Sequence, residues 1–288
     1  MTQEPFTGSA SAPATSANLG PAFDCLALAL DIRCQVRAIR ADEWEVKHIG
    51  AYQPEPGAVD CVLTAAKRTV GKASPLAIEV DSDIPIGKGL GSSAAAFVAG
   101  STAALLATTG EANPDHIFRL ASDMEGHADN VAAAVYGGLV LVPAEGVPIR
   151  LPLNPTLRVV VAVPERVLAT FHARTVIGSS HPHDLVRRSL ARVSALTAGL
   201  ITGDPGMLAA AHGDEIHEAP RAELSPEVND LIETAKQAGA MHAARSGAGP
   251  SVLALCSSEH EARVAAALEG PGLEVLRPSI ASTGLIWG

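Results

Sequence analysis

A glycine- and serine-rich segment that runs directly into an alanine-rich stretch constrains this chain more than any other feature. Residues 85–96 read Pro-Ile-Gly-Lys-Gly-Leu-Gly-Ser-Ser-Ala-Ala-Ala, and the apolar residues that follow predict a helix over about 91–108. Glycine lets the backbone adopt positive φ angles and approach a ligand closely. The start of a helix adds unpaired N–H groups and about half a positive charge. The segment therefore favours a site for a polyanion, most simply phosphate.

The order of residues in this loop separates it from two common nucleotide-binding loops. In a P-loop a lysine follows the last glycine, whereas Lys88 precedes the Gly-Leu-Gly-Ser-Ser run. Gly87, Gly89 and Gly91 do not fit the G-x-G-x-x-G pattern either. Taken alone, such a loop is also explained by a tight strand-to-helix connection. A phosphate site therefore requires partners elsewhere in the chain.

Composition narrows the class of protein. The chain has 288 residues, of which 47% are hydrophobic and 18% charged, so it can bury a sizeable core and is not expected to be disordered. The net charge is −10 and there is no basic run, which argues against nucleic acid as a partner. An enzyme for anionic nucleotides with this charge has to concentrate its positive groups locally.

Apolar runs, the start of the sequence and the cysteines indicate the cellular compartment. We find no apolar run of the about 18 residues that span a bilayer, and the polar start does not resemble a signal peptide. The cysteines lie in apolar segments without a C-x-x-C pair, so we expect them to be reduced core residues. These features predict a cytoplasmic protein without a membrane partner. The cysteines are Cys25, Cys34, Cys61 and Cys256.

Strand and helix patterns are mixed along the chain and reset once, around residue 155. They lack the regular βαβ alternation of a doubly wound sheet, which predicts an α+β fold in two halves, residues 1–155 and 156–288. In the first half we expect strands at 32–38, at 44–49 as its neighbour, at 76–80 and at 139–142, and helices beginning near 59 and at 114. In the second half we expect strands at 157–163, 240–245, 251–256 and 273–276, and helices near 183–201, 206–217, 226–238 and 259–269.

Two further segments are rich in small and turn-forming residues. Residues 13–24 read Pro-Ala-Thr-Ser-Ala-Asn-Leu-Gly-Pro-Ala-Phe-Asp and carry Asn18 and Asp24, side chains suited to a polar ligand. Residues 246–251 read Ser-Gly-Ala-Gly-Pro-Ser, where glycine permits a tight turn near a ligand. Taken singly, the first is also explained by a loop with a buried, turn-capping aspartate, and the second by a plain hairpin.

Together, and in this order, the three segments resemble the three signature motifs of the GHMP kinases, the superfamily of galactokinase, homoserine kinase, mevalonate kinase and phosphomevalonate kinase. The middle segment is similar to the P-x-x-x-G-L-G-S-S-A-A nucleotide loop, and the resemblance covers nearly the whole chain. Within the superfamily, residues 15–24 resemble the homoserine kinase family. The resemblance implies a half like the second domain of ribosomal protein S5, a ferredoxin-like half, a site between them, and a homodimer.

The resemblance further implies a kinase that phosphorylates the side-chain hydroxyl of L-homoserine, on the way to threonine. The substrate carboxylate suits a guanidinium, for which Arg174 and Arg221 are the candidates, and its ammonium suits Asp24. The segment at 214–221, Asp-x-Ile-His-Glu-x-x-Arg, is similar to a substrate-binding element of the family. The implied substrate-binding residues are Asn18, Asp24, His127, Thr170, Arg174, Arg221 and Gly247.

For ATP, the resemblance implies that the glycine-rich loop and the helix start after it hold the phosphates. Ser93 and Glu125 would supply oxygen ligands to Mg²⁺. A surface acid at a helix end is the alternative for Glu125, because the turn that follows it is shorter here than in many members. The implied nucleotide-binding residues are Pro85, Ile86, Gly87, Lys88, Gly89, Leu90, Gly91, Ser92, Ser93, Ala94 and Ala95.

Asp24, Lys88 and Asp129 are the candidate catalytic residues, and the use of a general base is left open. His127 and Asp129 fit a metal pair, a base with its orienting partner, or a turn that bonds the backbone. Asp60-Cys61 stands where many members carry an adenine-binding asparagine, so no adenine contact is carried over. The alternative functions are a GHMP kinase for another alcohol and a non-catalytic sensor of the same fold.

Overall fold

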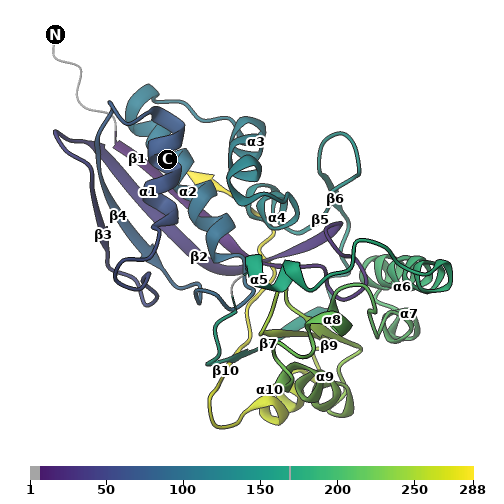
Figure 1. The fold of residues 1–288 in the computed structure, drawn as a ribbon. Helices are drawn as coiled ribbons and strands as arrows, with labels where there is room; N and C mark the ends of the chain where they lie inside the picture. Colours follow the sequence, from purple (N-terminus) through teal and green to yellow (C-terminus); the bar gives the residue numbers. More distant parts are fainter. Residues whose placement is uncertain (1–6, 169) are drawn as a thin grey trace.

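Two β-sheets, one formed mainly by each half of the chain, frame the molecule (Figure 1). The computed structural model describes residues 7–168 and 170–288. The first sheet runs in the order β11-β1-β2-β4-β3, with β5 paired to β2 and β6 paired to β5. Its strands are β1 (Thr7–Ala17), β2 (Leu26–Arg40), β3 (Glu45–His48), β4 (Leu76–Ser82), β5 (Leu139–Leu141), β6 (Ile149–Leu151) and β11 (Ile286–Trp287).

Helix α2 (Ser92–Thr109) lies on β1 and β2 and is the centre of the first half. It is apolar on all sides, as expected of a helix covered by other elements, and most of its residues are buried. Its small side chains allow it to pack closely on β1. The approach is so close that a Cβ on Gly8 of β1 would overlap the Ala103 carbonyl. The helices packed against it are α1 (Cys61–Val70), α3 (Pro114–Glu125) and α4 (Asp129–Tyr136).

The second sheet runs in the order β10-β7-β9-β8, with α9 and α10 packed against it. The chain end leaves this half again, because β11 pairs with β1 of the first sheet. The predicted division at residues 155 and 156 falls between β6 and β7 and stays a prediction. The elements of this half are β7 (Leu157–Pro164), α5 (Thr170–Thr175), α6 (His183–Thr202), α7 (Pro205–Ala210), α8 (Glu218–Arg221), α9 (Glu227–Gln237), β8 (His242–Arg245), β9 (Val252–Ser257), α10 (Glu261–Leu268) and β10 (Leu273–Leu276).

Three expectations about individual elements were wrong. The strand predicted at 44–49 pairs with β4 and not with β2, because β2 already has β1 on one edge and β4 on the other. The helix predicted at 206–217 ends at Ala210, because Gly213 takes a positive φ and the Asp214 carboxylate accepts from the N–H groups of His217 and Glu218. Cys25 is exposed, although all the cysteines are free as expected.

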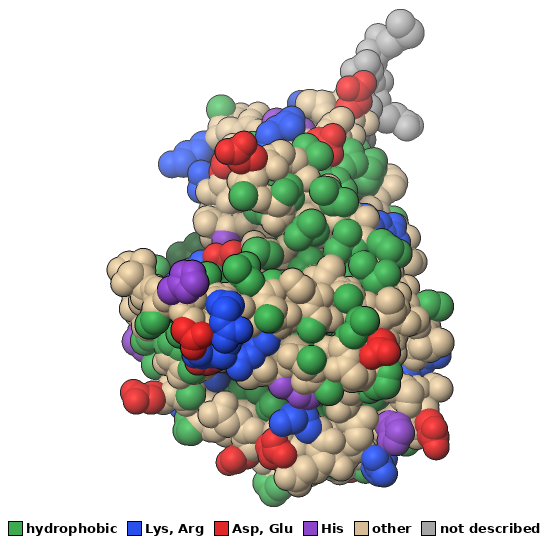
Figure 2. Space-filling model, turned by 90° about the vertical axis from the view of Figure 1, so that its right-hand side faces the viewer, with side chains coloured by type: hydrophobic (Ala, Val, Ile, Leu, Met, Phe, Trp, Pro, Cys, Tyr) green, Lys and Arg blue, Asp and Glu red, His purple; other side chains and the backbone are tan. Residues whose placement is uncertain are grey.

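Helix α2 also bears on the membrane expectation. By length and composition alone it is apolar enough to cross a bilayer, which the sequence patterns had excluded. Two thirds of it, 67%, is buried inside the protein, as in a core helix. On the face turned to the viewer in Figure 2, basic and acidic side chains lie interspersed.

Candidate active site

The glycine-rich loop between β4 and α2 is pinned on both sides by the two other signature segments. Gly87, Gly89 and Gly91 all have positive φ, and Gly91 is the N-cap of α2. A Cβ on Gly89 would overlap the Ser246 carbonyl, and one on Gly91 would overlap Oγ1 of Thr15. Glycine is therefore required here by close approach as well as by conformation. The loop presents the start of α2, with its free N–H groups, to the space in front of it.

A cavity of about 260 Å³ lies in front of this helix start. It extends from Ser93, Glu125 and His127 to a more apolar end formed around α1, β3 and β4. Of the predicted nucleotide-binding residues, those that line it are Ile86, Gly87, Gly89, Gly91, Ser92 and Ser93. Pro85, Lys88, Leu90, Ala94 and Ala95 are not among its lining residues; they belong to the loop and helix that form its wall.

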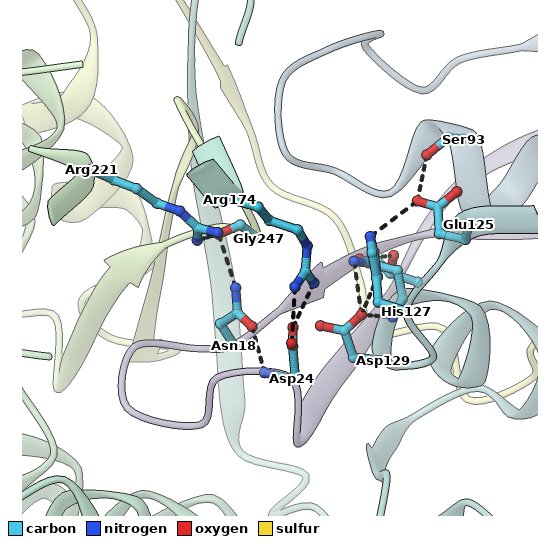
Figure 3. A network of polar contacts seen from close by, with 11 residues as sticks. Asn18, Asp24, Ser93, Glu125, His127, Asp129, Arg174, Arg221 and Gly247 are labelled. Carbon is cyan, nitrogen blue, oxygen red and sulfur yellow. Dashed lines mark hydrogen bonds and ion pairs between the residues drawn. The ribbon is translucent and has the colours of Figure 1, made fainter. Parts of the chain in front are cut away.

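Four polar side chains form a chain of contacts at the N-terminal end of α2 (Figure 3). Oγ of Ser93 donates to Oε1 of Glu125 at 2.6 Å. His127 lies between two carboxylates, with Nε2 at 3.6 Å from Glu125 and Nδ1 at 2.8 Å from Oδ1 of Asp129. The backbone N–H of Asn130 donates to the same Asp129 oxygen at 2.7 Å. The sequence places these groups together because α3 ends at Glu125 and α4 begins at Asp129.

The charges of this cluster shift its protonation equilibria. Burial raises the pKa of Glu125, although the Ser93 hydrogen bond and His127 act in the opposite direction. Burial alone would lower the pKa of His127, but the hydrogen bond and charge of Asp129 and the charge of Glu125 outweigh it and raise the pKa. Burial likewise opposes ionisation of Asp129, but the His127 hydrogen bond holds the pKa of that carboxyl below its usual range. The arrangement favours a protonated imidazole between two carboxylates.

A second cluster joins the two halves of the molecule through the loop at 18–24 (Figure 3). The Arg174 guanidinium donates to both oxygens of Asp24, at 2.7 and 3.0 Å. The Asn18 amide donates to the Gly247 carbonyl at 3.0 Å, and its oxygen accepts from the Asp24 N–H at 3.0 Å. Asn18 and Asp24 both have positive φ, which these contacts hold in place. Residues 246–251 do connect the antiparallel strands β8 and β9 as a hairpin, whereas Asp24 is not a buried turn cap but pairs with Arg174.

Arg221 is the most deeply buried of the predicted substrate-binding cations, with 1% of the residue exposed. Its Nε donates to the Ala173 carbonyl at 2.9 Å, and Nη1 donates to Nδ1 of His217 at 2.9 Å and to the Gly247 carbonyl at 3.2 Å. Burial, followed by the charges of Arg245 and Arg174, lowers the pKa of Arg221 to about 10. Among the described residues no carboxylate bonds it, so an anion beside it would be stabilised.

One predicted site residue, Lys88, lies away from the cavity, and another, Thr170, cannot be placed by its side chain. Nζ of Lys88 donates to the carbonyls of Pro164, Glu165 and Arg166, so the ammonium lies on the connection after β7 and not in the cavity. Thr170 begins α5, and its side chain lies outside the part of the structure that is described.

Sequence reasoning missed several residues at the apolar end of the cavity. Asp60 is the N-cap of α1, and its Oδ2 lies 2.7 Å from Nε2 of His48 on β3. The lining there also includes Tyr52, Val62 and Val80. The sequence pointed to this place only through Asp60-Cys61, which stand where many family members carry an adenine-binding asparagine, because nothing in the sequence shows that β3 lies next to the start of α1.

The fold and site define a GHMP kinase: residues 58–138 match the family described as GHMP kinases N terminal domain, and residues 196–272 match GHMP kinases C terminal. Homoserine kinase of Clavibacter michiganensis subsp. michiganensis is 39% identical over 272 residues, which cover 89% of this chain and 84% of that one. A homoserine kinase of Thermus thermophilus is 38% identical over 261 residues, 89% of each chain. The chain belongs to the homoserine kinase family.

Solved structures agree with this assignment. The crystal structure of homoserine kinase from Cytophaga hutchinsonii superimposes with a TM-score of 0.85 at 27% identity, covering 100% of this chain and 99% of that one. A mevalonate kinase structure, with a TM-score of 0.72 at 15% identity over 95% of this chain and 99% of that one, shares the fold. The predicted two-domain GHMP kinase fold and the predicted family are confirmed.

Proposed function

We infer that the protein is an ATP-dependent homoserine kinase, which transfers a phosphoryl group to the side-chain hydroxyl of L-homoserine and yields O-phospho-L-homoserine for threonine biosynthesis. The observation that carries this inference is the clamp made of Asp24, Arg174 and Arg221. It offers one carboxylate and two guanidiniums within one small region, which suits the ammonium and carboxylate of an amino acid. An uncharged sugar has no ionised groups that could pair with these three charges.

The substrate is proposed to bind with its carboxylate on Arg221 and Arg174 and its ammonium on Asp24. Arg221 lacks a carboxylate partner among the described residues, and Arg174 already has its guanidinium turned to Asp24. Asn18 and Gly247, which bond each other, lie beside the clamp. His127 would then contact the hydroxyl end, and Thr170 completes the proposed binding set.

The nucleotide is proposed to lie in the cavity in front of α2, with its phosphates on the N–H groups of the loop and helix start. Ser93 and Glu125 fit Mg²⁺, because this ion prefers oxygen ligands and their two oxygens meet at 2.6 Å on the cavity wall. When bound, the ion would offset phosphate charge during transfer. Loading the site would require Ser93 and Glu125 to give up the hydrogen bond that now joins them.

Phosphoryl transfer depends mostly on positioning and charge neutralisation. Asp129 is proposed to keep His127 protonated and oriented beside the reacting hydroxyl. Asp24 is proposed to act by holding the substrate, since both of its oxygens accept from Arg174. Lys88 is proposed to contribute by holding the connection 164–166 against the phosphate loop.

The test is ADP release from Mg-ATP with L-homoserine, D-homoserine, L-serine, L-threonine, mevalonate and galactose as acceptors. Strong dependence on L-homoserine is expected, because it alone fits charge, handedness and hydroxyl position. Turnover with another alcohol would keep the nucleotide site and overturn the substrate clamp. Binding of ATP with no turnover on any acceptor would favour a sensor. A homodimer in the cytoplasm is proposed from the family resemblance, and light scattering of the purified protein tests the dimer.

A further inference from the structure

Arg221 is oriented by one buried imidazole, that of His217. Nδ1 of His217 accepts from Nη1 of Arg221 at 2.9 Å, and on its other edge Nε2 lies 2.6 Å from the Gly20 carbonyl. The His217 side chain is fully buried. One ring thus connects the second half of the molecule to the 18–24 loop and at the same time contacts the guanidinium proposed to hold the substrate carboxylate.

The chemistry of the two partners fixes which nitrogen carries the proton. A guanidinium can only donate hydrogen bonds and a carbonyl oxygen can only accept them. His217 is therefore neutral, with hydrogen on Nε2 and a lone pair on Nδ1. In this state it satisfies both neighbours, and a ring with the proton on Nδ1 would leave Nη1 of Arg221 facing another donor. The contact selects one tautomer and one orientation of the guanidinium.

An aromatic side chain on the same loop completes the support. The Phe23 ring stacks on His217, with centroids 5.2 Å apart and 26° between the planes. The guanidinium carbons of Arg174 and Arg221 lie 5.5 and 5.7 Å from the Phe23 centroid. Phe23 therefore contacts the imidazole and both cations, and cation–π attraction favours this placement. Displacing His217 would remove the surface against which Phe23 packs.

We propose that His217 is a positioning residue for carboxylate recognition, which presents Arg221 to the substrate and holds the 18–24 loop through Gly20. The proposal rests on the proposed function, in which Arg221 binds the carboxylate of L-homoserine. It goes beyond the clamp itself, because His217 is buried and contacts Arg221, Phe23 and the loop, with Oδ2 of the buried Asp214 at 3.7 Å from its Nε2. Nε of Arg221 bonds Ala173, and Nη1 bonds His217 and Gly247. Among the described residues Nη2 has no hydrogen-bond partner.

The experiment compares two substitutions at this position. His217→Phe keeps a ring against Phe23 and removes both hydrogen bonds, whereas His217→Gln offers an amide oxygen to Arg221 and an amide N–H to Gly20. The acceptors are L-homoserine and 3-aminopropan-1-ol, which is the same amino alcohol without the carboxylate. His217→Phe is expected to raise KM for L-homoserine about tenfold or more, the loss typical of a charged hydrogen bond, with KM for ATP within about twofold. His217→Gln is expected to restore most of the affinity.

The amino alcohol separates positioning from general damage. Because 3-aminopropan-1-ol has no carboxylate for Arg221 to bind, its kcat/KM is expected to change less than about threefold in His217→Phe. His242→Gln is the matched control, because Nε2 of His242 bonds the Leu19 carbonyl at 2.9 Å and so holds the same loop without bonding an arginine. This control is expected to affect both acceptors equally. An unchanged KM for L-homoserine in His217→Phe, or an equal loss for both acceptors, would overturn the proposal.

A second measurement on the unaltered protein keeps the proposal testable if His217→Phe does not fold. Nitrogen-15 NMR of the His217 ring is expected to show Nδ1 without a proton at neutral pH and a shift of Nδ1 on addition of L-homoserine, but not of 3-aminopropan-1-ol. A protonated Nδ1, or no response to L-homoserine, would contradict it. Failure of the proposed function is visible separately, as absence of L-homoserine turnover by the unaltered enzyme.

Discussion

Arg174 and Asp24 stand 150 residues apart in the chain and meet through two hydrogen bonds of 2.7 and 3.0 Å. The pair brings one residue from each half of the molecule to the proposed acceptor site. Both side chains remain about a third exposed, so an added ligand can reach them. A zwitterion that binds here meets charges already arranged in complementary order, which reduces the cost of ordering the site.

Removing the guanidinium of Arg174 should weaken binding of the acceptor substrate. Arg174→Ala is expected to raise KM for L-homoserine roughly 10- to 100-fold, as for a lost charged hydrogen bond, and to leave KM for ATP within about twofold. Steady-state kinetics with each substrate varied in turn measure the split. Arg187→Ala, on the exposed face of α6 with its partner Asp184, is the matched control and should change neither constant. Equal increases in both constants would contradict a role in substrate binding.

Asp24→Asn tests how the carboxylate acts. Because both oxygens accept from Arg174, we expect it to bind the ammonium and not to remove a proton. KM for L-homoserine should rise about tenfold or more, while kcat should fall less than about tenfold. The same kinetic measurements decide the outcome. A fall in kcat of about a thousandfold with KM unchanged would instead identify Asp24 as the general base.

The hydrogen bond from Ser93 to Glu125 predicts a metal-dependent defect. Ser93→Ala removes a proposed Mg²⁺ ligand and the group that favours the ionised carboxylate of Glu125. We expect kcat to fall about 10- to 100-fold at fixed Mg²⁺ and to recover in part at higher Mg²⁺. The measurement is kcat against Mg²⁺ concentration. Ser101→Ala is the control, since Ser101 lies on the same helix and bonds Thr69 outside the cavity. An identical Mg²⁺ profile for Ser93→Ala would exclude the proposed ligand.

Asp60 caps α1 and also lines the apolar end of the cavity in which the nucleotide is proposed to lie. Its Oδ1 accepts from the N–H of Leu63 at 2.9 Å, and its Oδ2 contacts His48. Asp60→Ala should lower the free energy of unfolding by about 1–2 kcal/mol, as for a lost N-cap, and should raise KM for ATP. Urea denaturation and kinetics measure the two effects. Asn113→Ala removes the cap of α3 in the same way and should lower stability without a change in KM. If Asp60→Ala behaves like Asn113→Ala in both assays, the His48–Asp60 pair has no role in nucleotide binding.

Local rules predicted most of the elements in the sequence. The helix after the glycine-rich loop begins at Ser92, one residue from its expected start, and the Asn113-Pro114 start of α3 is confirmed. These features depend on neighbours in sequence, such as caps, turns and apolar spacing. The position of the glycine-rich loop against Thr15 and Ser246 depends on packing between segments, which local rules do not carry.

The site was predicted as a set of residues but not as a geometry. The resemblance assigned both Asp24 and Arg174 to the substrate, and the structure adds that they bond each other. The ammonium of Lys88 was expected near phosphate, and its bonds to carbonyls after β7 follow from a sheet that sequence alone does not place. His217 could be recognised only as part of the family pattern, because its partner Gly20 lies 197 residues away in the sequence.

His212 predicts a pH-dependent stability. Its Nε2 accepts from the N–H of Ala243 at 3.2 Å, and its ring stacks on His242 with centroids 5.0 Å apart. Burial, then the charges of His242 and Lys236, lowers the pKa of His212 to about 4. A histidine in the unfolded chain has a pKa of about 6.5. Between these values the unfolded chain binds more protons, so the free energy of unfolding falls as pH falls from about 6.5 towards 4.

The size of this loss of stability follows from the difference between the pKa values of His212 in the folded and the unfolded protein. At pH 5 the contribution is on the order of 2 kcal/mol, and partial exposure of the ring reduces it to about 1–2 kcal/mol. His212→Gln keeps a neutral acceptor for Ala243 at every pH, so its loss of stability between pH 7.5 and pH 5 should be smaller by that amount. Urea denaturation at the two pH values measures it. His116→Gln, on the exposed side of α3, should keep the original slope. An unchanged slope in His212→Gln would mean that His212 takes up its proton at the same pH in the folded and the unfolded protein, which would contradict the lowered pKa.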